Sequence, residues 1–153
     1  MKYSEVEVLL IEDNPHEAQL ALRCFRKYDL GARLMHIDDG IDALDFIFIR
    51  GKYEGTRTNE ALKVIFLDLK MPKIDGLEVL RQLKTDERTR TIPVVVLTSS
   101  REETDIQNAY RLGANSFMVK PVDFDTFNTV ISDLARYWIL TNESPSLVKK
   151  GEK

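Results

Sequence analysis

Short, uninterrupted runs of apolar residues alternate along the chain with longer stretches in which apolar residues recur every three or four positions. The run Val64–Leu67 is the clearest, because neither set of alternate positions in it is polar. Such a run is typical of a strand that is buried on both faces of a sheet. It ends in Asp68, and Pro72 disfavours continuation of a strand or a helix. The carboxylate is therefore expected where a buried strand opens into a loop.

Four further runs, at residues 5–11, 32–37, 92–97 and 116–119, complete the predicted strands. The run at 32–37 contains Arg33 and His36, which suits an edge strand better than a central one. Between the runs, five sets of apolar residues have helical spacing. Strands separated by helices of roughly 10–15 residues indicate a parallel sheet covered on both faces. The helical sets are Ala18, Ala21, Leu22 and Phe25; Leu44, Ile47 and Phe48; Gly76, Val79, Leu80 and Leu83; Ile106, Ala109 and Tyr110; and Phe127, Val130, Ile131, Leu134 and Trp138.

Polar residues mark the starts of three of these helices. Asn14 and Pro15 are predicted as N-cap and first helical residue, and Glu17 is placed to complete a capping box. The segment Asp38-Asp39-Gly40 offers a cap for the second helix, and Asp123 can cap the last. These signals place helix starts directly after the predicted strand ends.

Three segments lack periodicity and are predicted to be connections or a tail. Gly31 marks a turn after the first helix. Residues 53–60 are polar and contain Gly55, which predicts a surface loop somewhat longer than the ~4–6 residues of most compact connections. Residues 143–153 are predicted to be a flexible tail after one folded domain at 1–142, with no output domain following it.

The composition narrows the class of protein. A chain of 153 residues with 43% apolar residues has the length and core material of one domain. Its formal charge of -3, with both signs spread along the chain, gives no electrostatic footprint for nucleic acid. No apolar run approaches the ~20 residues of a membrane span, and the start lacks a signal-peptide pattern, so we expect a cytoplasmic protein without a membrane partner. Cys24 is the only cysteine, which excludes a disulfide framework and is expected to be a small buried residue.

The carboxyl ends of parallel strands lie at one edge of a sheet, which brings together polar residues that are distant in the sequence. Here these residues are Glu12, Asp13, Asp68, Thr98 and Lys120. Crowded carboxylates raise one another's pKa unless a cation neutralises them, and an all-oxygen site suits Mg²⁺. No histidine or thiolate is positioned to select zinc. The sequence therefore predicts a magnesium site at this edge.

The same residue types predict phosphoryl chemistry. A carboxylate beside Mg²⁺ can attack phosphorus and form an aspartyl phosphate. Charge then develops on the phosphoryl oxygens and needs donors, which a lysine ammonium and a threonine hydroxyl would supply.

With these residues placed, the chain resembles the receiver domains of two-component response regulators over nearly its whole length. The resemblance rests on motifs that follow one another at the predicted strand ends. The motifs are Glu12-Asp13, Asp68-Leu69-Lys70-Met71-Pro72 with Asp75-Gly76, Thr98-Ser99 and Phe117-Met118-Val119-Lys120-Pro121. The resemblance implies a flavodoxin-like (βα)5 α/β fold, in which a doubly wound parallel sheet has the strand order 2-1-3-4-5.

The resemblance also implies roles for the residues at the metal site. Asp68 matches the phosphoacceptor. Asp13, the Asp68 side chain and the Lys70 backbone carbonyl match direct Mg²⁺ ligands, and Glu12 would act through water. The side chains of Lys70 and Ser100 lie where the family tunes the lifetime of the phosphoryl group.

Further roles follow for the residues around the phosphoryl group. Thr98 and Lys120 match the phosphoryl-binding pair, with the backbone amide of Ser99 assisting. Phe117 matches an aromatic switch residue whose ring turns inward when Thr98 is drawn to the phosphoryl group. The resemblance thus implies a stand-alone regulator that receives its phosphoryl group from a sensor histidine kinase.

The end of the chain carries a narrower resemblance. Residues 137–140 and the tail at Asn142-Glu143 are similar to small regulators that partner cyanobacterial phytochromes, so a phytochrome is an expected kinase. Members of that group tend to self-associate through the fourth helix, fifth strand and last helix. Tyr137, Trp138 and Ile139 are consecutive on a helix and cannot all face the core, which fits a homodimer interface. Alternatively, Tyr137 and Trp138 simply close the end of the sheet.

The residues at the sheet edge also have plainer interpretations. Asp13 could be a cap-like residue, Thr98 a loop hydroxyl that satisfies a backbone group, and Phe117 ordinary core. Lys120 could be a surface lysine, although a cis peptide bond before Pro121 would aim its side chain inward. His16 and His36 are expected at the surface or strand edge rather than as ligands.

Two other functions are open from the residues alone. A Mg²⁺-dependent phosphatase or phosphotransferase could use Asp68 as its nucleophile on a small molecule, although no insertion is long enough to form a substrate cap. A phosphorylation-independent scaffold would require a dead site, yet no acidic or lysine position is missing.

Overall fold

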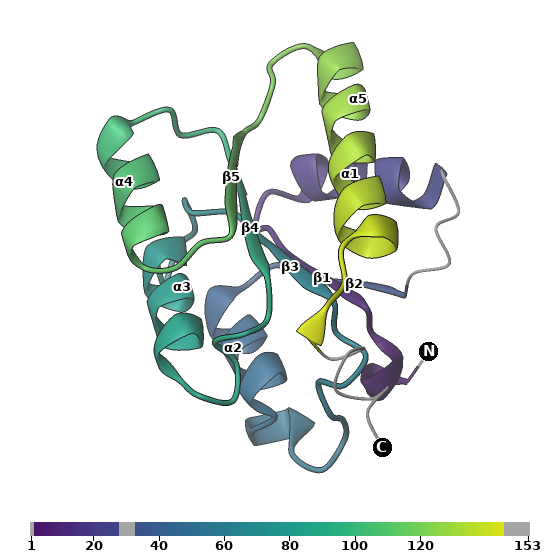
Figure 1. Ribbon diagram of the computed structural model, residues 1–153, viewed down its shortest axis with the longest axis vertical. Helices are drawn as coiled ribbons and strands as arrows, with labels where there is room; N and C mark the ends of the chain where they lie inside the picture. The colour runs from purple at the N-terminus through teal and green to yellow at the C-terminus, as the bar shows by residue number, and fades with distance from the viewer. Residues whose placement is uncertain (1, 28–32, 146–153) are drawn as a thin grey trace.

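A computed structural model of the chain describes residues 2–27 and 33–145. Five parallel strands form one sheet in the order β2-β1-β3-β4-β5 (Figure 1). The strands are β1 (Val8–Ile11), β2 (Leu34–Ile37), β3 (Val64–Leu67), β4 (Val94–Thr98) and β5 (Ser116–Val119). The predicted strand order is confirmed, and the segment predicted as an edge strand, β2, lies at one edge of the sheet.

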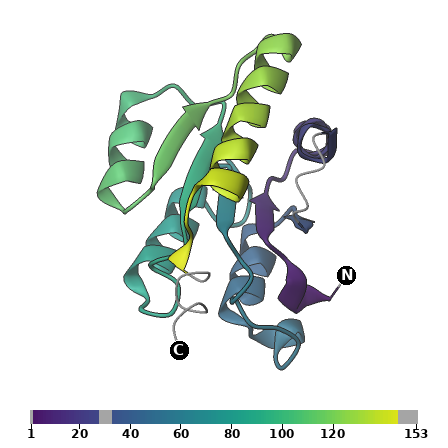
Figure 2. The ribbon, with the colours of Figure 1, turned by 45° about the vertical axis from the view of Figure 1, so that its right-hand side comes forward.

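Helices cover both faces of this sheet. Helices α1 and α5 pack on one face, and α2, α3 and α4 pack on the other (Figures 1 and 2). Their bounds are α1 (Pro15–Lys27), α2 (Gly40–Phe48), α3 (Gly76–Thr85), α4 (Glu103–Arg111) and α5 (Phe124–Ala135), with α5 continuing into the π-helical segment η3 (Arg136–Thr141) and short 3₁₀ turns at η1 (Tyr3–Glu5) and η2 (Gly51–Tyr53). Within the described residues, none of these helices has both the length and the apolar character to cross a membrane.

The central strands β1, β3 and β4 are buried along their whole length. In β3, Ile65 and Leu67 belong to the cluster under α2 and α3, whereas Val64 and Phe66 belong to the cluster under α1 and α5. The run is apolar at every position because alternate side chains meet the two opposite layers of helices, as predicted for a strand buried on both faces. Cys24 is buried in α1, as predicted for a small core residue.

The start of α1 differs in part from the predicted capping box. The backbone N–H of Glu17 donates to Asn14 Oδ1 at 3.0 Å, so Asn14 is the N-cap. The Glu17 carboxylate does not reach back to Asn14, because it pairs with the ammonium group of Lys120. The Asn14 N–H is satisfied instead by Glu12 Oε2 at 3.1 Å. A predicted capping residue thereby joins the site at the sheet edge.

The predicted caps of α2 and α5 are present. Asp39 accepts a hydrogen bond from the Ile41 N–H at 2.7 Å, and Asp123 accepts one from the Thr126 N–H at 2.9 Å. The predicted turn at Gly31 lies outside the described residues.

The segment at residues 53–60 is not the simple surface loop that its polar sequence predicts. Both Tyr53 and Arg57 are buried. The Arg57 guanidinium lies 3.8 Å from the centroid of the Phe46 ring and donates to the Phe46 carbonyl at 2.8 Å. The Tyr53 ring meets Phe46 edge-on. Polar residues pack here through cation–π and aromatic contacts, which hydropathy alone does not indicate.

Candidate functional site

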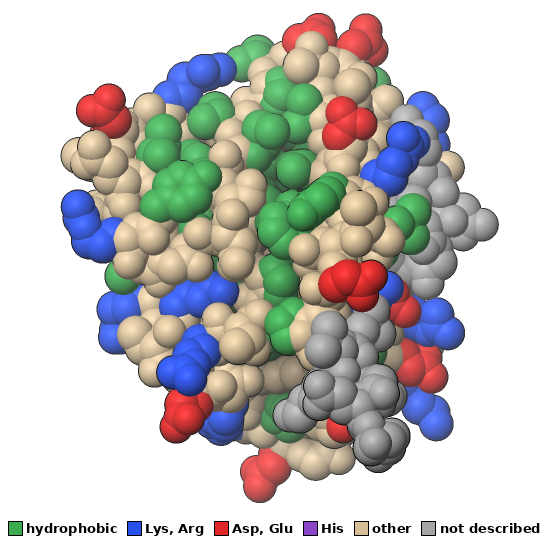
Figure 3. Space-filling view, viewed as in Figure 1, with side chains coloured by type: hydrophobic (Ala, Val, Ile, Leu, Met, Phe, Trp, Pro, Cys, Tyr) green, Lys and Arg blue, Asp and Glu red, His purple; other side chains and the backbone are tan. Residues whose placement is uncertain are grey.

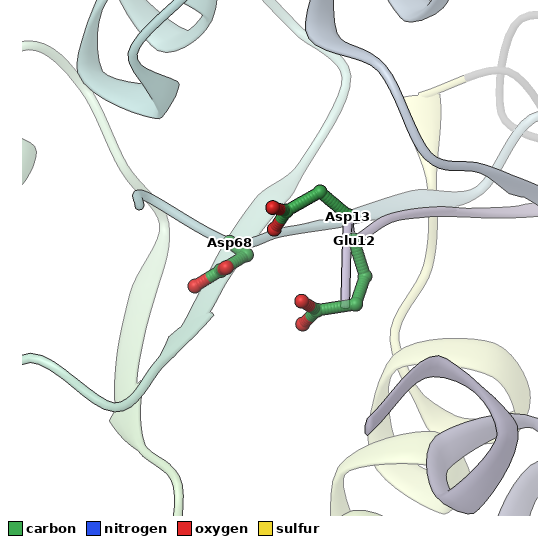
Figure 4. A group of neighbouring side chains, drawn as sticks. All are labelled: Glu12, Asp13 and Asp68. Carbon is green, nitrogen blue, oxygen red and sulfur yellow. The ribbon is translucent and has the colours of Figure 1, made fainter. Parts of the chain in front are cut away.

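Three carboxylates meet at the carboxyl edge of the sheet. Glu12 and Asp13 follow β1, and Asp68 follows β3, its neighbour in the sheet. One carboxylate oxygen from each residue lies within 4.8 Å of the others, and the three side chains converge (Figure 4). The group contains neither histidine nor cysteine, so the donor set suits a hard cation such as Mg²⁺. The predicted convergence of these three residues is therefore present.

Two of these three carboxylates are buried, which makes their negative charges unfavourable. Glu12 is 3% exposed and Asp68 is 6% exposed. Burial raises the pKa of Glu12 to about 7, although its hydrogen bond with Lys120 opposes the shift. Burial also raises the pKa of Asp68, and the charge of Asp13 adds to this rise while Lys120 and Thr98 oppose it. A divalent cation among the carboxylates would relieve both shifts, so the residues fit a metal.

Lys120 reaches the same group from the end of β5. Its Nζ lies 2.5 Å from Glu12 Oε1 and 3.9 Å from Asp68 Oδ1, and it also pairs with Glu17. Burial alone would lower the pKa of Lys120, but hydrogen bonds with Glu12 and Glu17 outweigh it and raise the pKa. The amine is therefore charged at neutral pH.

The backbone around Lys120 corrects one expectation. The peptide bond between Lys120 and Pro121 is trans, so the predicted cis bond is wrong. The Lys120 N–H donates to the Thr98 carbonyl at 2.8 Å. This bond extends the pairing of β4 and β5 by one residue. The extended pairing places Lys120 beside the carboxylates without a cis peptide bond.

Thr98 ends β4 and is fully buried. Its hydroxyl faces Asp68 and lowers the pKa of that carboxyl. Ser99 follows it and lines a surface groove of about 560 Å³ together with Lys120. Phe117 is partly buried and packs against the core cluster under α2 to α4, so its switch role stays a prediction.

Sequence reasoning missed Glu17 as a site residue. Its carboxylate is a second partner of Lys120, one turn into α1. Glu17 follows Asn14 by three residues, which is the spacing of a capping box, so nothing in the sequence indicated another partner. Only the end of β5, which is distant in sequence, gives Glu17 its actual partner.

Gly76 supports the loop that carries Asp68. A Cβ at this position would lie 2.4 Å from the Asp68 carbonyl oxygen and 2.6 Å from Leu69 Cα. We expect Gly76→Ala to destabilise the fold by about 1–3 kcal/mol, because these clashing atoms are backbone, and to weaken Mg²⁺ binding. Denaturant unfolding and Mg²⁺ titration measure the two effects. Gly55→Ala is the control, since its Cβ would meet no atom within 4 Å and its cost is strain at a φ of +75°. Unchanged Mg²⁺ affinity in Gly76→Ala would contradict a positioning role.

The raised pKa of Glu12 predicts a pH-dependent effect of Mg²⁺ removal. Because the folded chain holds this proton more tightly than the unfolded chain, the free energy of unfolding of the metal-free protein falls as pH rises from 4.5 to about 7. Bound Mg²⁺ favours the ionised carboxylates, so Mg²⁺ should raise the melting temperature more at pH 8 than at pH 5. Thermal unfolding with Mg²⁺ or with a chelator measures this difference. Glu12→Gln should reduce this difference and leave the part that comes from the raised pKa of Asp68. Equal stabilisation of the wild type at both pH values would oppose the account.

A family model described as the response regulator receiver domain matches residues 8–132. The chain is 38% identical to the probable methanogenesis regulatory protein FilR2 of Methanothrix harundinacea, over 90% of this chain and 86% of that protein. It is 31% identical to the response regulator Rcp1 of Synechocystis sp., over 91% of this chain and 92% of that protein.

Solved structures give the same result. The Mn²⁺-bound form of Rcp1 superposes with a TM-score of 0.85 at 30% identity, over 92% of this chain and 99% of that one. The phosphorylated cyanobacterial phytochrome response regulator RcpA superposes with a TM-score of 0.83 at 29% identity, with the same coverage. The matched range contains all the residues that converge at the sheet edge. This chain therefore belongs to the response regulator receiver domain family of two-component signalling.

Proposed function

We propose that this protein is a response regulator that accepts a phosphoryl group on Asp68 from a sensor histidine kinase. The observation that carries the proposal is the arrangement around Asp68, a buried carboxylate with two further carboxylates on one side and the charged Lys120 3.9 Å away. These contacts support the proposal because phosphoryl transfer to a carboxylate needs a nucleophile, a cation and a donor to the phosphoryl oxygens in one place.

The metal is proposed to be Mg²⁺. Asp13, Asp68 and the backbone carbonyl of Lys70 would hold it, and Glu12 would act through water. Bound there, the ion would neutralise charge on the phosphoryl oxygens. The all-oxygen donor set of the acidic group supports this choice, and the structure of Rcp1 is of a form that binds Mn²⁺.

The protein's own donors would complete the site. The Lys120 ammonium and the Thr98 hydroxyl would bind phosphoryl oxygens, assisted by the backbone amide of Ser99. Thr98 and Phe117 lie on the paired strands β4 and β5, in which Val96 is opposite Phe117. Movement of Thr98 toward the phosphoryl group would therefore change the packing of Phe117. To shift this surface almost completely from one conformation to the other, the phosphoryl group must favour the second conformation by about 5.5 kcal/mol.

Incubation with acetyl phosphate tests the switch against the alternative of a Mg²⁺-dependent phosphatase or phosphotransferase. A switch takes up one acid-labile phosphoryl group per chain and loses it slowly to water. An enzyme that uses Asp68 as its nucleophile on a small molecule would turn over its substrate many times. Repeated turnover of small phosphorylated compounds would overturn the proposal in favour of the enzyme.

The partner is proposed to be a phytochrome kinase. The support is the likeness to Rcp1 and to RcpA, which is a cyanobacterial phytochrome response regulator. A cytoplasmic location without nucleic-acid or membrane partners is part of the same proposal. The net charge of -3, with both signs spread along the chain, gives no electrostatic footprint for nucleic acid.

We also propose a homodimer through the face of α4, β5 and α5. Hydrophobic side chains gather along this face between α4 and α5 (Figure 3). Tyr137 is 49% exposed and packs edge-on against the partly buried Trp138, whereas Ile139 is buried and belongs to the core. The three consecutive residues therefore divide between surface and core.

Tyr137 gives the cleaner test of the dimer, because Trp138→Ala would also remove packing against the core cluster. Tyr137→Asp is expected to shift the protein from dimer to monomer with an unchanged far-UV spectrum. Analytical ultracentrifugation of wild type and variant measures the shift. A wild-type protein that sediments as a monomer both with and without beryllofluoride would contradict this interface.

A further inference from the structure

We propose that Asp105, in the first turn of α4, is a positioning residue that holds Lys70 in the unphosphorylated protein and loses it to the phosphoryl group on Asp68. The inference rests on the proposed phosphorylation of Asp68 and adds a contact that opposes it. Its elements are a carboxylate on α4, a lysine on the β3–α3 loop and a serine after β4.

One carboxylate oxygen joins these elements. Asp105 Oδ2 accepts a hydrogen bond from Ser100 Oγ at 2.5 Å and lies 3.2 Å from Lys70 Nζ. Ser100 in turn donates its N–H to Thr98 Oγ1 at 3.4 Å and accepts the Glu102 N–H at its hydroxyl. A chain of polar contacts therefore runs from Thr98, beside the phosphoacceptor, to the start of α4 and back to the β3–α3 loop.

The two side chains of this ion pair differ in how freely they can move. The Asp105 side chain is only 14% exposed and is held by the hydrogen bond from Ser100, so its position is fixed. The Lys70 side chain is 57% exposed on a flexible stem. The lysine can therefore change partners, whereas the carboxylate cannot follow it.

Phosphorylation would supply a competing partner. Lys70 follows Asp68 by two residues in the β3–α3 loop, so its long and exposed side chain starts close to the phosphoacceptor. A phosphoryl group adds about -1.5 to -2 charges at neutral pH, more than the single charge of Asp105. Lys70 is then drawn toward the phosphoryl group and away from α4.

The release matters because α4 has few other attachments. Among its residues, only Ala109 is buried. The contacts of Asp105 therefore form a large part of what holds the first turn of α4 against the site. A contact made only in the unphosphorylated state must, by thermodynamic linkage, oppose the phosphorylated state.

The test uses the full chain with Mg²⁺ and beryllofluoride as the phosphoryl mimic. Asp105→Asn keeps the size of the side chain and its bond to Ser100 but removes the charge pairing with Lys70. We expect beryllofluoride to bind about 2–5-fold more tightly, the range that a partly exposed ion pair supplies. Hydrogen exchange in residues 101–111 should become faster without beryllofluoride. Glu102→Gln, whose carboxylate lies 3.9 Å from Lys70 and is 71% exposed, is the matched control and should change neither quantity.

A double-mutant cycle separates the ion pair from a general effect of charge. In a Lys70→Met background, Asp105→Asn should leave beryllofluoride affinity unchanged. The inference is overturned if Asp105→Asn tightens binding equally in that background, or if affinity and exchange in Asp105→Asn both match wild type. If no form of the protein binds beryllofluoride, the proposed function fails. Unchanged hydrogen exchange in Asp105→Asn would then also exclude the proposed role of the contact between Asp105 and Lys70.

Discussion

Asp68→Asn should abolish incorporation of phosphoryl groups from acetyl phosphate. An amide is a far weaker nucleophile than a carboxylate, and Asp68 is the member of the acidic group that lies beside both Thr98 and Lys120. Asparagine has nearly the same shape and removes a buried charge that burial already disfavours. The variant is therefore expected to fold with stability equal to or above that of the metal-free wild type.

Intact-mass spectrometry with and without acid treatment measures this loss. Asp75→Asn is the matched control, because Asp75 lies in the same β3–α3 connection and caps α3 through the Leu77 N–H at 3.0 Å. Asparagine is also a good N-cap, so this control should be phosphorylated at the wild-type level. Wild-type incorporation in Asp68→Asn would show that the phosphoacceptor lies elsewhere.

Lys120→Met should lower the rate of phosphoryl incorporation by on the order of 10²–10³-fold, the usual cost of losing one preorganised donor to developing charge. The Lys120 side chain is 7% exposed, and its ammonium is the cation nearest to Asp68 among the described ion pairs. Methionine keeps the length of the stem without the charge. Glu12 and Glu17 would then lose their shared partner.

The same substitution has a second expected effect, on stability. Removing one member of a buried ion pair costs about 3–5 kcal/mol, so the metal-free variant should unfold more easily, and Mg²⁺ should restore part of the loss. Phosphorylation kinetics and thermal unfolding with and without Mg²⁺ measure both effects. Lys73→Met is the control, because this exposed lysine pairs with Asp39 outside the site. Phosphorylation of Lys120→Met at the wild-type rate would contradict the role of the lysine.

Much of the fold follows from the sequence because the central strands are apolar on both faces. Val64–Leu67 is such a run, and its position in the middle of the sheet requires that pattern. The carboxyl ends of such strands share an edge, so Asp13, Asp68 and Thr98 could be placed together without coordinates. The site residues at the strand ends were therefore predictable from the sequence.

The contacts that could not be predicted depend on side chains meeting across elements. Glu17 has the spacing of a capping residue, and only the end of β5 redirects it to Lys120. Arg57 is polar in sequence, yet it is buried over the Phe46 ring. Asp105 belongs to no motif in the sequence, yet its carboxylate contacts both Lys70 and Ser100. Each of these partners is set by packing in three dimensions, which periodicity does not encode.

A crystal structure of the protein with Mg²⁺ and beryllofluoride tests the central claim most directly. The account predicts beryllium bonded to a carboxylate oxygen of Asp68, with the Thr98 hydroxyl and the Lys120 ammonium at hydrogen-bond distance from the fluorides. It also predicts Mg²⁺ among Asp13, Asp68 and the Lys70 carbonyl. A site that stays empty at saturating concentrations of both, or a Lys120 side chain that points away from the bound group, would contradict it.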